Sequence, residues 1–202
     1  MRNRIIVFEG PDNIGKSTMV DLLEKKLDAE TLLQPNSCNS LGFLRERLKQ
    51  GGLEIDSLAR QLLHTCSHIV DFYEFISRNN KVLLMDRCYI SALIYGTADK
   101  QPVENLKIIK DIHNSVYGDL SLSFDIDLFI LYSSSYKTES DGSYYEDKLD
   151  TSLINTLYRE IDNDIGGYYL GSQERIYKID VSKFSCVKET FNFVLNKIKG
   201  IS

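Results

Sequence analysis

The sequence lacks any apolar run that approaches the roughly 20 residues of a membrane-spanning helix. Its N-terminal residues lead directly into a strand-like segment, so we expect no signal peptide. The four cysteines are scattered without a C-x-x-C pair, which favours reduced and mostly buried thiols over a disulfide framework. Together these absences predict a protein of the cytoplasm, in the producing or host cell.

The sequence also lacks a face rich in lysine or arginine. Its net charge is −5, which disfavours binding to duplex nucleic acid. A small anionic substrate is still compatible with this charge, because a few focused positive groups can hold it. Neither an internal repeat nor a linker interrupts the 202 residues, a length that suits one α/β domain with a full core. We therefore expect a single domain, 1–202.

Short apolar runs alternate with longer amphipathic stretches along the chain. Strands are expected at 4–9, 31–34, 81–86, 127–132 and 175–180, and helices at 16–28, 41–50, 57–78, 90–95, 104–117, 151–162 and 185–199. This alternation predicts an α/β fold with a five-stranded parallel sheet and helices on both faces. The polar stretch after the fourth strand falls at the edge where such sheets bind ligands, so we expect a lid over about 133–148, with a passive surface loop as the alternative.

The segment from Gly10 to Thr18 fits the pattern G-x-x-x-x-G-K-[ST] of a phosphate-binding loop, the P-loop. It lies between an apolar strand and a helical stretch, where backbone N–H groups and the helix dipole converge on one spot. We expect Lys16 to reach the β- and γ-phosphates of ATP and Ser17 to hold Mg²⁺; a chance match in an ordinary strand-turn-helix is the alternative. The residues expected to bind the cofactor are Gly10, Asn13, Ile14, Gly15, Lys16, Ser17 and Thr18.

A second group of polar residues closes the third expected strand. Asp86 can position Mg²⁺ or its water, and Arg87 can bridge donor and acceptor phosphates through its guanidinium fork. Tyr95 follows Ser91 by one helical turn and is expected to face the same cleft. Asp12, within the P-loop, is repelled by phosphates and suits a sugar hydroxyl or a metal-bound water. The alternatives are a structural Asp–Arg pair at the strand end and a turn-stabilising aspartate at position 12.

Two blocks of the sequence resemble the thymidylate kinase family. Phe8–Thr18 matches its pattern F-E-G-x-D-x-x-G-K-S-T, and Asp86–Tyr95 resembles its pattern D-R-Y-x-x-S-x-x-A-Y, at matching separation. Three weaker segments follow in the family's order, at 33–35, 62–68 and 144–146. Order and spacing hold over about residues 5–180, nearly the whole chain.

The resemblance implies a P-loop NTPase fold with a short lid, and transfer of the ATP γ-phosphoryl group to a deoxynucleoside monophosphate. It also implies a homodimer built on helices near the third expected helix. The catalytic residues would be Lys16, Arg87 and Asp12, and the metal site Ser17 and Asp86. The substrate-binding residues would be Asp12, Pro35, His64, His68, Arg87, Ser91, Tyr95 and Tyr145.

The chain departs from this family at the acceptor site. His64 stands where the family has a base-stacking Phe, and His68 where it has a base-reading Arg. Imidazole stacks with less area than phenyl, and histidine lacks the fixed fork and permanent charge of arginine. A modified pyrimidine or a purine is therefore expected to fit at least as well as dTMP. Solvated or capped histidines without a ligand are the alternative.

The usual catalytic arginine is missing as well. Neither the P-loop nor the lid carries one, and the segment 34–37 lacks the arginine that holds the acceptor phosphate in the family. Lys137 in the lid, or Arg45 and Arg47 in the second helix, could substitute for it. Without a substitute the enzyme would be slow, because such an arginine can be worth about 10³–10⁵ in turnover.

The sequence is compatible with two other functions. A deoxynucleoside kinase phosphorylates a neutral hydroxyl and needs a carboxylate base after the second strand, where this chain has Gln34. An amide cannot take the proton, which counts against that function. The second is a nucleotide-binding protein with a decayed kinase site, which the missing arginines favour and the intact P-loop opposes.

Overall fold

The computed structural model describes residues 3–49, 55–118, 124–136, 149–161 and 175–200. Its centre is a five-stranded sheet in which every neighbouring pair of strands is parallel, in the order β2-β3-β1-β4-β5. The strands are β1 (Asn3–Glu9), β2 (Glu30–Leu33), β3 (Leu83–Asp86), β4 (Phe124–Tyr132) and β5 (Ile176–Asp180). The predicted five-stranded parallel sheet is therefore confirmed.

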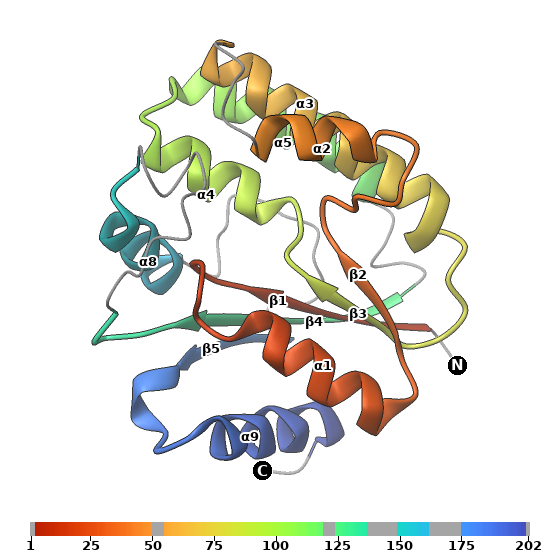
Figure 1. Ribbon diagram of the computed structural model, residues 1–202, viewed down its shortest axis with the longest axis vertical. Coiled ribbons are helices and arrows are strands. Elements are labelled where there is room, and N and C mark those ends of the chain that lie inside the picture. Colours follow the sequence, from red (N-terminus) through yellow and green to blue (C-terminus); the bar gives the residue numbers. More distant parts are fainter. Residues whose placement is uncertain (1–2, 50–54, 119–123, 137–148, 162–174, 201–202) are drawn as a thin grey trace.

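Helices cover both faces of this sheet (Figure 1). One face packs against α1 (Lys16–Leu27) and α9 (Val187–Lys199). The other packs against α4 (Ile90–Ala98), α5 (Val103–Tyr117) and α8 (Thr151–Glu160). Beyond these, α3 (Ser57–Asp71) packs on α4 and α5, and α2 (Gly42–Lys49) packs on α3. A short 3₁₀ turn, η3 (Val181–Lys183), follows β5.

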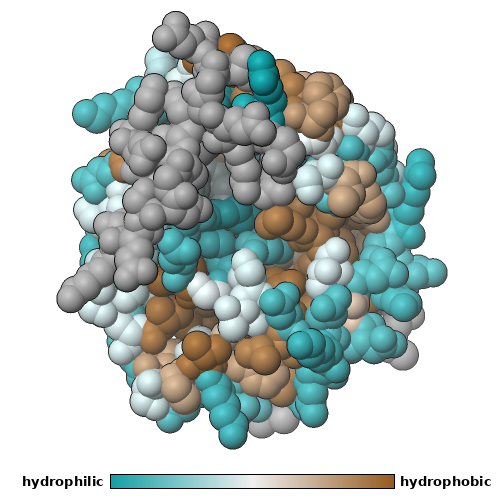
Figure 2. Space-filling view, in the orientation of Figure 1, coloured by the Kyte–Doolittle hydropathy of each residue, from teal (hydrophilic) through white to brown (hydrophobic). Residues whose placement is uncertain are grey.

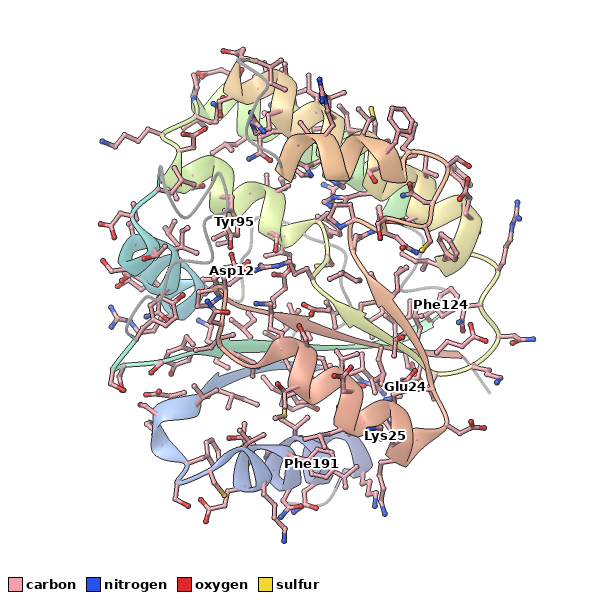
Figure 3. The ribbon with its side chains drawn as sticks, in the orientation of Figure 1. Asp12, Glu24, Lys25, Tyr95, Phe124 and Phe191 are labelled. Atoms are coloured by element: carbon pink, nitrogen blue, oxygen red, sulfur yellow. The ribbon has the colours of Figure 1, made fainter. Side chains whose placement is uncertain are left out.

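The strand β1 explains why both faces need cover. Its side chains alternate, so that Ile5 and Val7 join the core under α4 and α8, whereas Ile6 and Phe8 join the core under α1 and α9. All four are at most 1% exposed. Strands buried on both faces read as continuous apolar runs, which is why the sequence identifies them clearly. In Figure 3, Asp12 and Tyr95 lie on one side of the sheet, and Phe191 lies with α9 on the other.

The helix expected at 57–78 changes its geometry before it ends. After Asp71 it continues as a π-helical turn, η1 (Phe72–Ile76), and the Ser77 N–H donates to the Phe72 carbonyl at 2.8 Å. Apolar spacing cannot distinguish a widened last turn from an α-helix. The other element boundaries differ from the expected ones by a few residues.

The expectation of mostly buried thiols was wrong. Cys88 is buried, but Cys38, Cys66 and Cys186 are exposed, and all four are free. A thiol without a disulfide partner can lie at the surface, because the apolar side chains near it in the sequence already fill the core. Within the described residues, no helix is long and apolar enough to cross a membrane.

Parallel pairing brings the P-loop and the end of β3 to one edge of the sheet. Phe8 pairs with Asp86, and the Arg87 N–H donates to the Phe8 carbonyl at 2.8 Å. The turn after β1 requires a glycine at position 10, because φ there is +149° and a Cβ would lie 2.3 Å from the Leu131 carbonyl oxygen. This edge is where polar residues from distant parts of the chain meet.

Candidate active site

A pocket of about 560 Å³ opens at the carboxyl edge of the sheet. Its volume lies within the range of small-molecule sites. Figure 2 shows hydrophilic residues gathered around a hollow near the centre of this face. The pocket is lined by Asp12, Asn13, Gly15, Lys16, Ser17, Thr18, Leu33, Gln34, Pro35, Gln61, His64, His68, Asp86, Arg87, Ser91, Ala92 and Tyr95.

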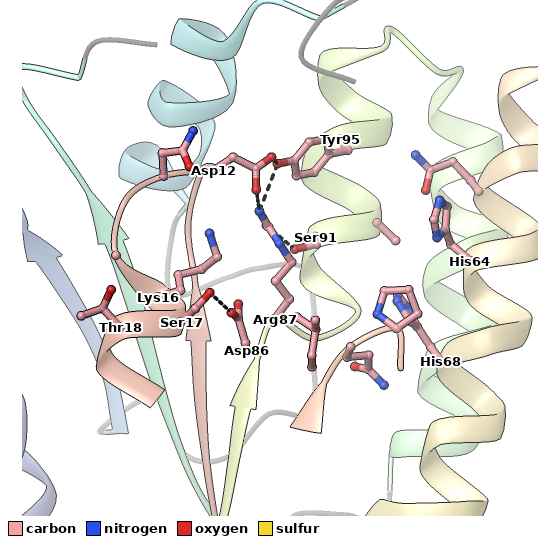
Figure 4. Close-up of a pocket in the computed structure, with 17 residues that line it drawn as sticks. Asp12, Lys16, Ser17, Thr18, His64, His68, Asp86, Arg87, Ser91 and Tyr95 are labelled. Atoms are coloured by element: carbon pink, nitrogen blue, oxygen red, sulfur yellow. Dashed lines mark hydrogen bonds and ion pairs between the residues drawn. The ribbon is translucent and has the colours of Figure 1, made fainter. Parts of the chain in front are cut away.

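The P-loop forms one wall of the pocket, where α1 begins (Figure 4). Gly15 adopts a left-handed conformation, with φ at +98°, just before the first helical residue, Lys16. The Lys16 ammonium is buried and donates to the Pro11 carbonyl at 2.6 Å. Burial, together with the nearby Arg87 charge, lowers the pKa of Lys16 to about 7. A phosphate beside it would restore the charge of this lysine.

Ser17 and Asp86 meet below the P-loop. The Ser17 hydroxyl donates to Asp86 Oδ2 at 2.6 Å, and Asp86 Oδ1 is buried without a hydrogen-bond partner among the described residues. Hydroxyl and carboxylate oxygens are the ligands that Mg²⁺ prefers, usually with substrate phosphates and water completing the shell. Within the described part of the chain, no group of three His, Cys, Asp or Glu could bind a metal alone. The pair fits a magnesium ion that shares its ligands with a nucleotide.

Arg87 holds the middle of the pocket. Its backbone has φ at +72°, in the left-handed region, and its guanidinium donates to the Gly10 carbonyl at 3.0 Å and to Ser91 Oγ at 3.1 Å. It also pairs with Asp12, and Asp12 accepts a second hydrogen bond from the Tyr95 hydroxyl at 2.9 Å. Residues 12, 87, 91 and 95 therefore lie together in the pocket, and Arg87 pairs with Asp12 rather than with Asp86.

The charges in this group support one another. Burial alone would raise the pKa of Asp12, but the Arg87 and Lys16 charges bring it below its ordinary value. Burial alone would lower the pKa of Arg87. The nearby Tyr95 and Asp12 outweigh this effect and raise the pKa well above its ordinary value. The pair is thus ionised at neutral pH, and the guanidinium is held ready for an anion.

Glu9 and Tyr158 belong to this network, and neither was expected from the sequence. Glu9, fully buried at the end of β1, accepts from the Cys88 N–H at 2.7 Å, the Ser91 hydroxyl at 2.7 Å and the Tyr158 hydroxyl at 2.9 Å. Tyr158, from α8, also lies 3.4 Å from the Arg87 guanidinium. An acidic residue directly after the apolar run Ile5–Phe8 was the available signal for Glu9.

The wall opposite the P-loop comes mainly from α3 (Figure 4). His64 and His68 lie one helical turn apart on it, with Gln61 one turn before His64, and all three line the pocket. His68 is only 3% exposed, so the alternative of a solvated histidine is wrong for it. Burial, and then the neighbouring His113, hold the pKa of His68 well below its ordinary value. Gln34 and Pro35, after β2, complete this wall.

Some expected site residues lie elsewhere. Gly10 and Ile14 do not line the pocket; Ile14 packs in the core under α1. Arg47 is exposed on α2 and does not line the pocket that the described residues form. Tyr145 and Lys137 lie outside the described residues, as does the expected lid beyond Tyr136.

The chain is similar in sequence to thymidylate kinases. The thymidylate kinase family model matches residues 8–141. A probable thymidylate kinase of Methanobrevibacter smithii is 30% identical over 186 residues, covering 88% of this chain and 92% of that protein. The thymidylate kinase of Staphylococcus haemolyticus is 26% identical, covering 96% and 98%.

Solved structures agree with the fold. The thymidylate kinase of Candida albicans superposes with a TM-score of 0.71 at 18% identity, covering 98% of this chain and 92% of that one. The thymidylate kinase of Ehrlichia chaffeensis gives 0.69 at 16%, covering 98% and 99%. At these identities the structures establish the P-loop NTPase fold alone, whereas the family model extends over more than half of the chain. The chain belongs to the thymidylate kinase family.

Proposed function

We propose that the chain transfers the γ-phosphoryl group of ATP to a deoxynucleoside monophosphate related to dTMP. The observation that carries this proposal is the single pocket that joins the P-loop, the Arg87–Asp12 pair and the polar α3 wall. The first suits a triphosphate, the second a phosphate with a sugar, and the third a base. A pocket of about 560 Å³ has room for the acceptor nucleotide next to the donor phosphates.

Phosphoryl transfer depends on positioning the two substrates and neutralising their charges more than on a covalent intermediate with the protein. The N–H groups around Gly15 and the Lys16 ammonium would hold the donor phosphates, because they converge at the start of α1. Arg87 would align the acceptor phosphate, and its hydrogen bonds to Gly10 and Ser91 fix the guanidinium in advance. The acceptor phosphate is already ionised at neutral pH, so the reaction needs no general base.

Ser17 and Asp86 would hold Mg²⁺ in the proposed site, as their oxygens and the unpartnered Asp86 Oδ1 suit it. A bound Mg²⁺ would neutralise charge on the phosphate oxygens. Asp12, paired with Arg87 and Tyr95, would keep one carboxylate edge beside the acceptor sugar. The cationic side chains that line the described pocket are Lys16 and Arg87, and they are the groups on which we place the stabilisation of the transferring phosphoryl.

A deoxynucleoside kinase is disfavoured by the residue after β2. Gln34 is buried there, and its amide donates to the Tyr117 hydroxyl at 2.8 Å. An amide in this position supplies no general base for a neutral hydroxyl. Binding of nucleotide without transfer is the remaining alternative, and the Lys16, Ser17, Asp86 and Arg87 arrangement argues against it.

The test is ADP release from ATP and Mg²⁺ with each deoxynucleoside monophosphate and each deoxynucleoside as acceptor. We expect turnover with at least one monophosphate and with none of the nucleosides. Turnover with nucleosides alone would make the chain a deoxynucleoside kinase. Tight ATP binding without any acceptor would leave a nucleotide-binding protein.

We propose in addition that residues 1–202 act as one kinase domain in a cytoplasmic homodimer. Val103 and Ile108 on α5 are 76% and 48% exposed, and α5 packs beside α3, so apolar side chains remain at that surface for a second copy. Light scattering after size exclusion should give twice the 23.2 kDa of one chain. A single-chain mass would contradict the dimer without affecting the proposed reaction.

A further inference from the structure

Gln34 and His68, in the wall opposite the P-loop, each bond to helix α5. They are 1% and 3% exposed. The Gln34 amide Nε2 lies 2.8 Å from the Tyr117 hydroxyl, and His68 Nδ1 lies 3.1 Å from His113 Nε2. These contacts decide where the hydrogens are, and hence what the wall offers to a base.

The histidine pair has a single consistent arrangement of hydrogens. His113 Nδ1 lies 2.8 Å from the Ile109 carbonyl, which can only accept, so Nδ1 carries the hydrogen. Burial lowers the pKa of His113 to about 4, so the ring is neutral at pH 7 and its Nε2 is an acceptor. His68 must then donate from Nδ1. Because His68 is also neutral, its Nε2 is left as an acceptor.

The same kind of argument determines the orientation of the Gln34 side-chain amide. The Tyr117 hydroxyl lies 2.6 Å from the His68 backbone carbonyl and donates its one hydrogen there. Its oxygen can therefore only accept from Gln34, so the amide nitrogen faces Tyr117. Gln34 Oε1 is left buried without a hydrogen-bond partner among the described residues. The wall thus has two acceptors, Gln34 Oε1 and His68 Nε2, whose orientation is set from α5.

The α5 residues that set them are packed too tightly to turn easily. His113 is 0% exposed and Tyr117 is 2% exposed. The Tyr89 ring stacks on His113 at 4.9 Å with an interplanar angle of 19°, and it contacts Tyr117 at 5.2 Å. Neither α5 residue lines the pocket, so each acts through its partner in the wall.

We propose that this wall selects a base with an exocyclic amino group, and that His113 and Tyr117 are the positioning residues for that selection. The proposal rests on the proposed function, because a monophosphate held at Arg87 extends its base toward α3. An amino group has two hydrogens for two acceptors. Thymine has one ring N–H at that edge and a 4-oxo oxygen. The oxygen is itself an acceptor, so it would face one of the two acceptors of the wall with no hydrogen between them. Unpaired buried groups of this kind lower kcat/KM by roughly 10-fold to 100-fold.

Two matched substrates test the proposal. 5-Methyl-dCMP and dTMP differ at the 4-position and the adjacent ring nitrogen but share the methyl group, the sugar and the phosphate. We expect kcat/KM to be at least about 10-fold higher for 5-methyl-dCMP. A ratio of one or less, with measurable turnover, overturns the selection but leaves the kinase function intact. Absence of turnover with every monophosphate overturns the proposed function itself.

Variants on α5 test the positioning. Tyr117→Phe removes the oxygen that orients Gln34, and His113→Phe removes the acceptor that orients His68. We expect either change to reduce the substrate ratio several-fold, while Tyr73→Phe, an exposed tyrosine on η1, leaves it unchanged. A ratio that stays the same in both folded variants overturns the role of α5. In the unaltered protein, ¹⁵N NMR should find the hydrogen of His68 on Nδ1, and finding it on Nε2 overturns the proposal without any variant.

Discussion

The Ser17 hydroxyl donates to Asp86 Oδ2 at 2.6 Å across 69 residues of sequence. Parallel pairing of β1 with β3 creates this contact, because it places the start of α1 beside the end of β3. One oxygen of the carboxylate is used by the serine, and the other has no hydrogen-bond partner within the described residues. The relationship defines where a magnesium ion would bind, and it leads to the first prediction.

Asp86→Asn should raise the Mg²⁺ concentration needed for half-maximal transfer by about 10-fold to 100-fold. An amide keeps the size of the side chain but removes the charge that attracts the cation. Asp125→Asn is the control, since Asp125 is a half-exposed carboxylate on β4 paired with Arg175 at 3.8 Å. Titration of turnover against Mg²⁺ measures the effect. Equal Mg²⁺ dependence in both variants would remove Asp86 from the metal site.

Lys16→Met should reduce phosphoryl transfer by more than about 100-fold, because the donor phosphates lose their buried cation. The same change should stabilise the protein near pH 7. The pKa of Lys16 is about 7 in the folded protein and near its ordinary 10.5 in the unfolded chain. Between these values the unfolded chain binds the proton and the folded protein does not. The cost of burying Lys16 is therefore complete below about pH 7 and decreases as pH rises toward 10.5.

Thermal unfolding at several pH values tests this stability effect. We expect Lys16→Met to raise Tm by at least ~2 °C at pH 7, where each kcal/mol corresponds to about 2–4 °C for a domain of this size. The gain should shrink toward pH 10. Lys25→Met, on the exposed end of α1, should show neither the gain nor its pH dependence. A constant difference across the pH range would mean that Lys16 is not desolvated.

Arg87→Lys should reduce kcat/KM for the acceptor by about 10-fold to 100-fold, although the charge is kept. The guanidinium reaches Gly10 and Ser91 through one terminal nitrogen and Asp12 through the other, and the single ammonium nitrogen of lysine lacks this planar fork. Initial rates at varied acceptor concentration, with ATP saturating, measure the loss. Arg159→Lys, on the exposed surface of α8, is the matched control. Similar rates for the two variants would show that the fork at position 87 is not needed.

His64→Phe combined with His68→Arg should shift preference toward dTMP by about 10-fold. The arginine replaces the acceptor at position 68 with donors, which suit the 4-oxo oxygen of thymine, and the phenyl ring offers a larger stacking surface. The ratio of kcat/KM for dTMP to that for 5-methyl-dCMP is the measurement. If the ratio does not move, neither histidine faces the base.

The strands and the P-loop could be predicted because their signals are local. Strands buried on both faces are continuous apolar runs, and the P-loop is nine contiguous residues. The grouping of Asp86, Arg87, Ser91 and Tyr95 also followed from one segment of chain. What these residues bind in the folded protein did not follow, because Arg87 pairs across 75 residues with Asp12.

Tyr158 and His113 could not be identified from the sequence for the same reason. Each lies in a segment whose apolar spacing predicts only core, and each acquires its role from a partner on another element. The hydrogen positions on His68 follow from its contact with His113 and from the hydrogen bond between His113 and the Ile109 carbonyl, so no motif that contains His68 alone can indicate them.

The two walls of the pocket are positioned by different parts of the fold. The phosphate-facing groups are built on β1, α1 and β3, where the backbone turn at Gly10 tolerates no side chain. The opposite wall takes its orientation from α5, a helix outside the pocket. Under the selection proposed above, a mutation in α5 would change the accepted base while the groups at the P-loop edge keep their positions. On the same proposal, two such enzymes that differ only in α5 would differ in base preference, although neither His113 nor Tyr117 lines the pocket that the described residues form.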